Sequence, residues 1–140
     1  MARKFDEFHD EISVEWFGRP FEGKTHTDVY AVLEPGGRLF PDGNIYHGRF
    51  WGKDGKRDAH MMTLYCSRED LAGPCLKHEV CHAVFTDWFP DRIPQDLEEA
   101  IARHYDCKEP GYVLVPKEEL KRQLVRWQEL TARRAPIGVR

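Results

Sequence analysis

The sequence has no long apolar segment, no secretory signal and no excess of basic charge, and each of these absences excludes a class of protein. No apolar run approaches the ~18 residues that a membrane-spanning helix needs, because a charge or a glycine interrupts every candidate. Residues 1–11 contain no apolar core of the kind that secretory signals carry. We therefore expect a cytoplasmic protein whose 4 cysteines form no disulfides and are either buried or bound to a metal.

The charge is nearly balanced, which removes another class of partner. The net charge is −3, and the chain has no basic stripe beyond Arg133 and Arg134, so we expect neither a nucleic acid nor a membrane as partner. A content of 41% hydrophobic and 32% charged residues is typical of a folded chain. A length of 140 residues predicts a single domain with one core.

The hydrophobic pattern changes about halfway along the chain. Residues 1–66 are expected to be mainly β, with about 3–4 strands, residues 67–133 mainly α, and residues 134–140 a frayed tail. Strands followed by helices predict an α+β domain. The expected elements are a short helix over 4–11, strands over Ile12–Trp16 and Thr27–Leu33, a hairpin of Asn44–Trp51 with Ala59–Cys66, and helices over 74–86, 94–106 and from Pro116.

Chemistry is indicated most clearly by His78-Glu79-Val80-Cys81-His82, an H-E-x-x-H motif inside the expected 74–86 helix. The composition gives about 0.03 such matches per chain by chance. Residues four apart lie on one helix face, so both imidazoles can reach a single ion. Glu79 lies about 100° around the helix, where it can accept a proton from a zinc-bound water. The motif predicts one Zn²⁺ per chain, held by His78 and His82, with Glu79 as general base.

A catalytic zinc needs a third protein ligand, and two glutamates on the next expected helix are candidates. Glu98 shares a helical face with Ile101 and Tyr105, which favours an inward position. Glu99 neighbours a solvated set of residues. We therefore predict Glu98 as the third ligand, with Glu99 as the alternative.

The motif and the acidic helix start Leu97-Glu98-Glu99-Ala100 together resemble the zincin metallopeptidases with a glutamate third ligand. The resemblance covers about residues 60–106 and is nearest to the small ImmA/IrrE-type and phage-encoded metallopeptidases. It implies a zincin-like fold, with a small sheet followed by the motif helix and the glutamate helix. It also implies His78 and His82 as ligands, Glu79 as catalytic base and Glu98 as ligand.

The same resemblance implies further roles. In the family an Asn or Asp commonly follows the glutamate by four residues and binds a ligand histidine; here that position is Ala102, which leaves Asp87 or Asp106 for the role. In the family an edge strand along the cleft binds substrate backbone, and Ala59–Cys66 is the equivalent segment, although the residues alone favour an ordinary core strand there.

Two further side chains are candidates for stabilising the oxyanion of a tetrahedral intermediate. They are His104 and Tyr105, with Tyr112 as an alternative to the tyrosine. The preferred interpretation is thus a zinc-dependent endopeptidase that acts on a protein or peptide.

Two other interpretations stay open. One is a catalytically silent zincin-fold module that binds a partner, although such a module has no need of Glu79. The other is a structural zinc site built from a set of cysteines and histidines: Cys75, His78, Cys81, His82 and Cys107. The chain contains no C-x-x-C pair, which disfavours the structural site.

Overall fold

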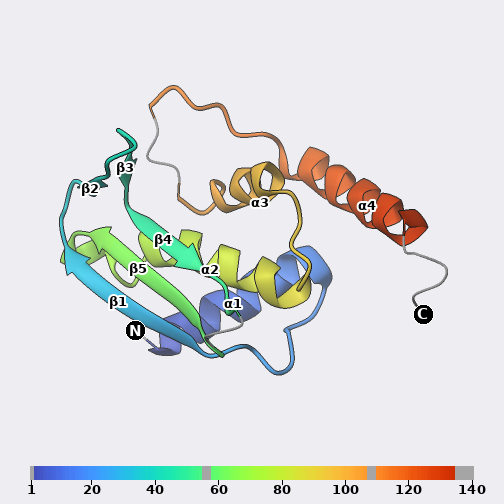
Figure 1. The fold of residues 1–140 in the computed structure, drawn as a ribbon, viewed down its shortest axis with the longest axis horizontal. Helices are drawn as coiled ribbons and strands as arrows, with labels where there is room; N and C mark the ends of the chain where they lie inside the picture. Colours follow the sequence, from blue (N-terminus) through green and yellow to red (C-terminus); the bar gives the residue numbers. More distant parts are fainter. Residues whose placement is uncertain (1, 55–57, 107–109, 135–140) are drawn as a thin grey trace.

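This computed structural model describes residues 2–54, 58–106 and 110–134 (Figure 1). Within these ranges the chain forms helices and a small mixed sheet. This arrangement confirms the α+β class. The helices are α1 (Ala2–Phe17), α2 (Pro74–Trp88), α3 (Gln95–Ala102) and α4 (Lys117–Arg134), with a 3₁₀ turn at Arg68–Asp70. The strands are β1 (Thr27–Leu33), β2 (Arg38–Leu39), β3 (Ile45–Tyr46), β4 (Gly48–Trp51) and β5 (His60–Cys66).

The three-stranded sheet has the order β1-β5-β4, and β2 pairs separately with β3. β4 is antiparallel to β5, with Gly48 opposite Leu64, which confirms the expected hairpin. β1 is parallel to β5, with Thr27 opposite His60. β5 has hydrogen-bonded neighbours on both sides, so Ala59–Cys66 is a central strand and not the edge strand that the resemblance implies. β4 is the edge strand that contacts α2.

Helix α2 is the centre of the molecule and contacts β4, β5, α1 and α3. It begins at Pro74, where the missing N–H costs no helical hydrogen bond, and this agrees with the expected helix start. Its apolar side chains are almost completely buried: Leu76, Val80, Cys81, Ala83, Val84 and Phe85. Since little of α2 faces solvent, its polar side chains must find partners within the protein.

Helix α1 differs from the expectation. A short helix over 4–11 and a strand over Ile12–Trp16 were predicted, but one helix covers both segments. Phe5, His9 and Ile12 recur every three or four residues and are buried together. The alternation that indicated a strand is coincidental, because Val14 is 49% exposed. The first 66 residues therefore begin with a long helix, which precedes the strands β1 to β5.

The last two helices lie close to their expected positions. α3 ends at Ala102, four residues before the expected end, because the amides of His104 and Tyr105 bond to carbonyls three residues back. α4 buries Leu120 and Leu124. The frayed tail predicted for 134–140 falls, beyond residue 134, outside the described residues. Within the described ranges, no helix combines the length and the apolar character needed to cross a membrane.

A buried polar contact links α1 to α2 in the core. Nε2 of His9 donates to Oδ2 of Asp87 over 2.9 Å, and both side chains are almost fully buried. Nε2 of His60 lies 3.9 Å from the other oxygen of Asp87. Removing one partner of such a contact leaves a polar group buried without compensation.

Asp87→Ala is expected to lower the free energy of unfolding by about 3 kcal/mol, because it leaves His9 without its acceptor in the core. Asp28→Ala is the matched control, since Asp28 contacts His26 at the same 2.9 Å distance on the surface. The control is expected to change stability by less than about 0.5 kcal/mol. Urea unfolding measures both, and equal losses in the two variants would contradict this view of the core.

Candidate metal centre

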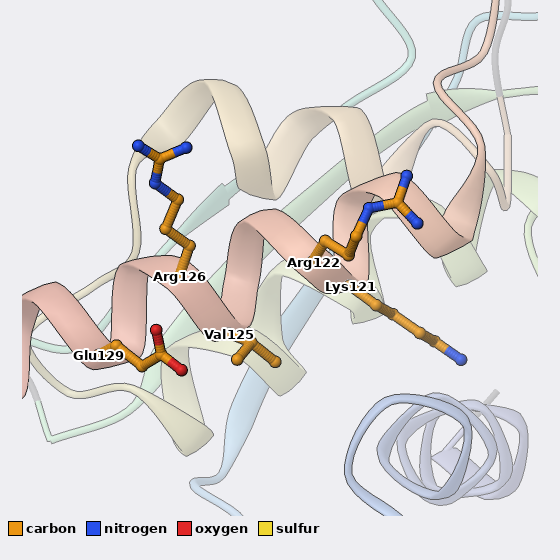
Figure 2. A pocket seen from close by; sticks show the side chains of 5 residues that line it. All are labelled: Lys121, Arg122, Val125, Arg126 and Glu129. Carbon is orange, nitrogen blue, oxygen red and sulfur yellow. The ribbon is translucent and has the colours of Figure 1, made fainter.

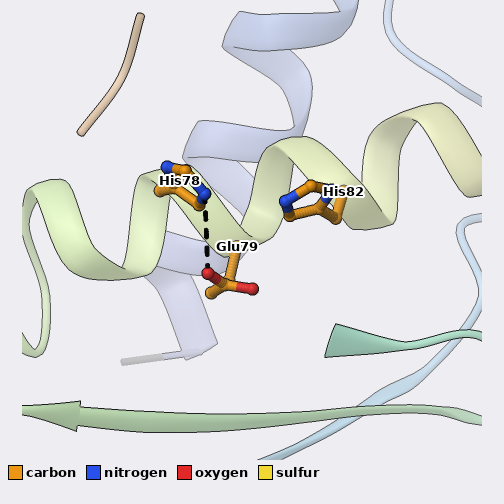
Figure 3. Close-up of side chains that lie close together, drawn as sticks. All are labelled: His78, Glu79 and His82. Atoms are coloured by element: carbon orange, nitrogen blue, oxygen red, sulfur yellow. Dashed lines mark ion pairs between the residues drawn. The ribbon is translucent and has the colours of Figure 1, made fainter. Parts of the chain in front are cut away.

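The three polar residues of the motif gather on one side of α2 (Figure 3). One possible ligand atom each from His78, Glu79 and His82 can be chosen so that all three lie within 4.8 Å of one another. The side chains of His78 and His82 are only 15% and 12% exposed. The i, i+4 spacing on a helix therefore brings the two imidazoles together, as the sequence predicted.

The Nδ1 atom of each imidazole makes a hydrogen bond within the protein. Nδ1 of His78 donates to the main-chain carbonyl of Asp106 over 2.7 Å. Nδ1 of His82 donates to Oε2 of Glu98 over 2.7 Å. These bonds leave Nε2 of both rings for an ion, which is how metal-ligating histidines are usually oriented. Of the two aspartates considered for this role, Asp106 serves through its carbonyl, whereas Asp87 is bonded to His9.

The structure places the two glutamates of α3 differently from the expectation. Oε1 of Glu99 lies 3.1 Å from Nε2 of His78, and its Oε2 lies 3.1 Å from Nε2 of His82. Glu98 is 1% exposed, as its inward position required, but its Oε2 is occupied by His82 and by Arg92 at 2.9 Å. The geometry thus favours Glu99 over Glu98 as the glutamate beside an ion. Glu98 is the more buried of the two, but it contacts Nδ1 of His82, whereas Glu99 contacts Nε2 of both histidines.

The carboxylates and the two imidazoles of this cluster shift one another's pKa values. Burial alone would lower the pKa of His82, but hydrogen bonds to Glu98 and Glu99 outweigh it and raise that pKa to about 10. The pKa of His78 is raised in the same way, against burial, by Glu99 and Glu79. The two imidazoles hold the pKa of Glu99 well below its usual range, although burial opposes this. Two imidazole nitrogens and a carboxylate are a donor set that fits Zn²⁺.

Glu79 lies beside this donor set. Its carboxylate is 3.8 Å from Nε2 of His78, farther than that of Glu99, and burial raises its pKa. The side chain packs against Gly48 at the start of β4: a Cβ on Gly48 would lie 2.7 Å from Cγ of Glu79. Sequence reasoning missed Gly48, because only the fold brings β4 against the motif helix.

The residues expected to stabilise an oxyanion are bonded elsewhere. The Tyr105 hydroxyl accepts a hydrogen bond from Trp16 and donates to Glu15, both on α1. Nε2 of His104 donates to the carbonyl of Val115 over 2.5 Å.

The alternative tyrosine is also engaged. The ring of Tyr112 lies against the guanidinium of Arg103, 4.0 Å from its centroid, and Nε of Arg103 is 3.6 Å from Oε1 of Glu99. These hydrogen bonds and ring contacts of the three candidates are therefore with groups other than His78, His82 and Glu99.

The cysteines do not join this cluster in the described residues. The Cys75 thiol donates to the carbonyl of His47 over 3.0 Å, and burial raises its pKa far above normal. Burial also raises the pKa of Cys81. The group of possible metal ligands found among the described residues contains no cysteine, so this arrangement does not favour a structural Cys/His site. Cys107 lies outside the described residues.

A concave surface lies away from this cluster, on α4. The stems of Lys121, Arg122, Val125, Arg126 and Glu129 line this open, shallow hollow (Figure 2). It offers neither an imidazole nor a thiol, and so it is not a candidate metal site.

Comparisons of the chain with protein-family models, with curated proteins and with solved structures found no significant match. The functional argument for this chain therefore depends on the His78-Glu79-His82 group and its surroundings.

The contact between Gly48 and Glu79 can be tested by substitution. Gly48→Ala is expected to displace Glu79 and to lower the free energy of unfolding by about 1–3 kcal/mol, because the added methyl overpacks the contact. Gly36→Ala is the control, since a Cβ there meets no atom within 4 Å. Equal stability of the two variants in chemical denaturation would show that Gly48 and Glu79 are not in tight contact.

The stability of the metal-free protein should depend on pH above neutrality. The pKa of His82 is raised in the folded state from 6.5 to about 10. Its stabilising effect is therefore complete below pH 6.5 and is lost as the pH rises toward 10. Thermal unfolding in chelator should show this decline, and His82→Gln should reduce it. The stabilisation by added zinc should instead grow over the same range, since zinc requires deprotonated imidazoles. A flat profile for the chelated wild type would contradict the assigned contacts.

Proposed function

We propose that the protein is a zinc-dependent peptidase that hydrolyses a peptide bond within a protein or peptide. In this proposal His78, His82 and Glu99 hold one Zn²⁺, and Glu79 is the general base. The observation that carries it is the bridge formed by the Glu99 carboxylate, 3.1 Å from each Nε2, with a second carboxylate close by but farther off.

The ligand set differs from the sequence expectation in its third member. Glu99 takes the place expected for Glu98, and Glu98 orients His82 through Nδ1. A carboxylate behind a ligand histidine fixes its tautomer and its direction. This accounts for both neighbouring glutamates and supplies the contact that Ala102 cannot make.

Glu79 has the properties that a general base needs. When bound, zinc polarises the scissile carbonyl and lowers the pKa of a coordinated water. Glu79 accepts the proton at its carboxylate and later delivers it to the leaving amine. Contact with Gly48 restricts the position of this carboxylate, which lies 3.8 Å from Nε2 of His78.

A substrate position follows from the sheet. β4 begins at Gly48, next to Glu79, and forms the edge of the three-stranded sheet. An extended peptide can add to such an edge through main-chain hydrogen bonds, which recognise peptide backbone of any sequence. In this proposal β4 takes the role that the sequence assigned to Ala59–Cys66.

Glu79→Gln tests the proposal, because the amide keeps the shape of the side chain but cannot accept the proton. Turnover is expected to fall by about 10²–10⁴-fold, while zinc affinity stays within about twofold. Glu69→Gln, outside the site, is the matched control and should leave both unchanged. The measurement is cleavage of a peptide library and of cellular proteins, with and without chelator.

The outcomes separate the remaining interpretations. Cleavage that persists undiminished in Glu79→Gln would contradict the proposed base. A wild type that binds zinc but cuts nothing that the variant spares would favour the silent binding module. Zinc held by thiolates would favour the structural site.

A further inference from the structure

Arg92, in the loop between α2 and α3, has an unusual backbone conformation. Its φ is +61°, and among the described residues it is the one non-glycine residue with positive φ. This left-handed conformation is unfavourable for a residue with a long side chain, whereas glycine adopts it freely. A strained residue persists where the surrounding structure requires its side chain, and such residues cluster at functional sites.

The contacts of the Arg92 side chain identify that requirement. Nη2 donates to Oε2 of Glu98 over 2.9 Å, and the same oxygen accepts from Nδ1 of His82 over 2.7 Å. The guanidinium also lies beside Gly52, just after β4: a Cβ there would be 3.7 Å from Nη1. Arg92 therefore contacts the imidazole of His82 indirectly, through the carboxylate of Glu98.

The Glu98 side chain needs such a partner to stay in place. It is 1% exposed, and its Oε1 is buried with no hydrogen-bond partner among the described residues. A buried carboxylate held at one oxygen can rotate to satisfy the other. A second donor on Oε2 opposes this rotation and keeps that oxygen aligned with Nδ1 of His82.

We propose that Arg92 is a positioning residue for zinc binding: through Glu98 it holds Nε2 of His82 toward the ion. This inference rests on the proposed function, since it assumes that His82 is a metal ligand. It also explains why an arginine stands where glycine would be less strained. The conformational cost is retained because the guanidinium orients the site.

Three substitutions at position 92 separate the side chain from the backbone. Arg92→Gly and Arg92→Ala both remove the guanidinium, but only glycine relieves the positive φ. Arg92→Lys keeps a positive donor. Zinc dissociation constants, measured by competition with a chromophoric chelator, are compared with urea unfolding of the chelated proteins. Arg126→Gln, on the exposed surface of α4, controls for the loss of one positive charge.

The expected result is that zinc affinity follows the guanidinium. Arg92→Gly and Arg92→Ala should both bind zinc at least about tenfold more weakly, although the glycine variant is the more stable of the two. Arg92→Lys should recover part of the loss, and Arg126→Gln should match the wild type. In a Glu98→Gln background, Arg92→Gly should weaken binding by less than about threefold, because the effect passes through Glu98.

Other results would overturn the inference. A zinc affinity of Arg92→Gly within twofold of the wild type would exclude a positioning role. So would zinc affinities that rank the variants in the same order as their stabilities to urea. A full tenfold loss that persists in the Glu98→Gln background would show that Arg92 acts elsewhere. If the wild type binds zinc tightly in these cases, the proposed function survives and only the role of Arg92 fails. A wild type without zinc affinity would overturn both.

Discussion

The site depends on one constraint: α2 is buried on nearly all sides, yet it carries two histidines and a glutamate that must be satisfied without bulk water. The core takes one side of the helix, through residues such as Leu76 and Val80. The other side faces α3 and β4, and the neighbouring elements supply what the polar groups need. Asp106 offers a carbonyl, Glu98 offers a carboxylate, and Gly48 offers space.

The electrostatic balance follows from this arrangement. Against the effect of burial, Glu98 and Glu99, which both bond to the imidazole of His82, favour its protonated form when no metal is present and raise its pKa to about 10. A divalent cation can replace that proton, which links metal binding to pH and to folding. The raised pKa values of the two histidines and the metal-binding hypothesis thus both follow from the carboxylates that lie against the ring nitrogens.

Much of the fold and the centre of the site could be predicted from the sequence. The motif helix, the hairpin and the strand Thr27–Leu33 carry strong local signals, namely periodicity, glycine-rich loops and a proline at the helix start. The errors arose where tertiary packing decides. Nothing local shows that β1 pairs in parallel with β5, which makes β5 central. The choice between Glu98 and Glu99 could not be made from the sequence for a related reason: a helical wheel indicates burial but does not show which nitrogen of His82 a carboxylate contacts.

The most direct measurement is an anomalous-scattering map of crystals grown with one equivalent of zinc. This account predicts one peak per chain, about 2.0–2.2 Å from Nε2 of His78, Nε2 of His82 and a carboxylate oxygen of Glu99, with Glu98 still on Nδ1 of His82. A peak coordinated by Glu98 or by a cysteine, or the absence of any peak at this site, would contradict it.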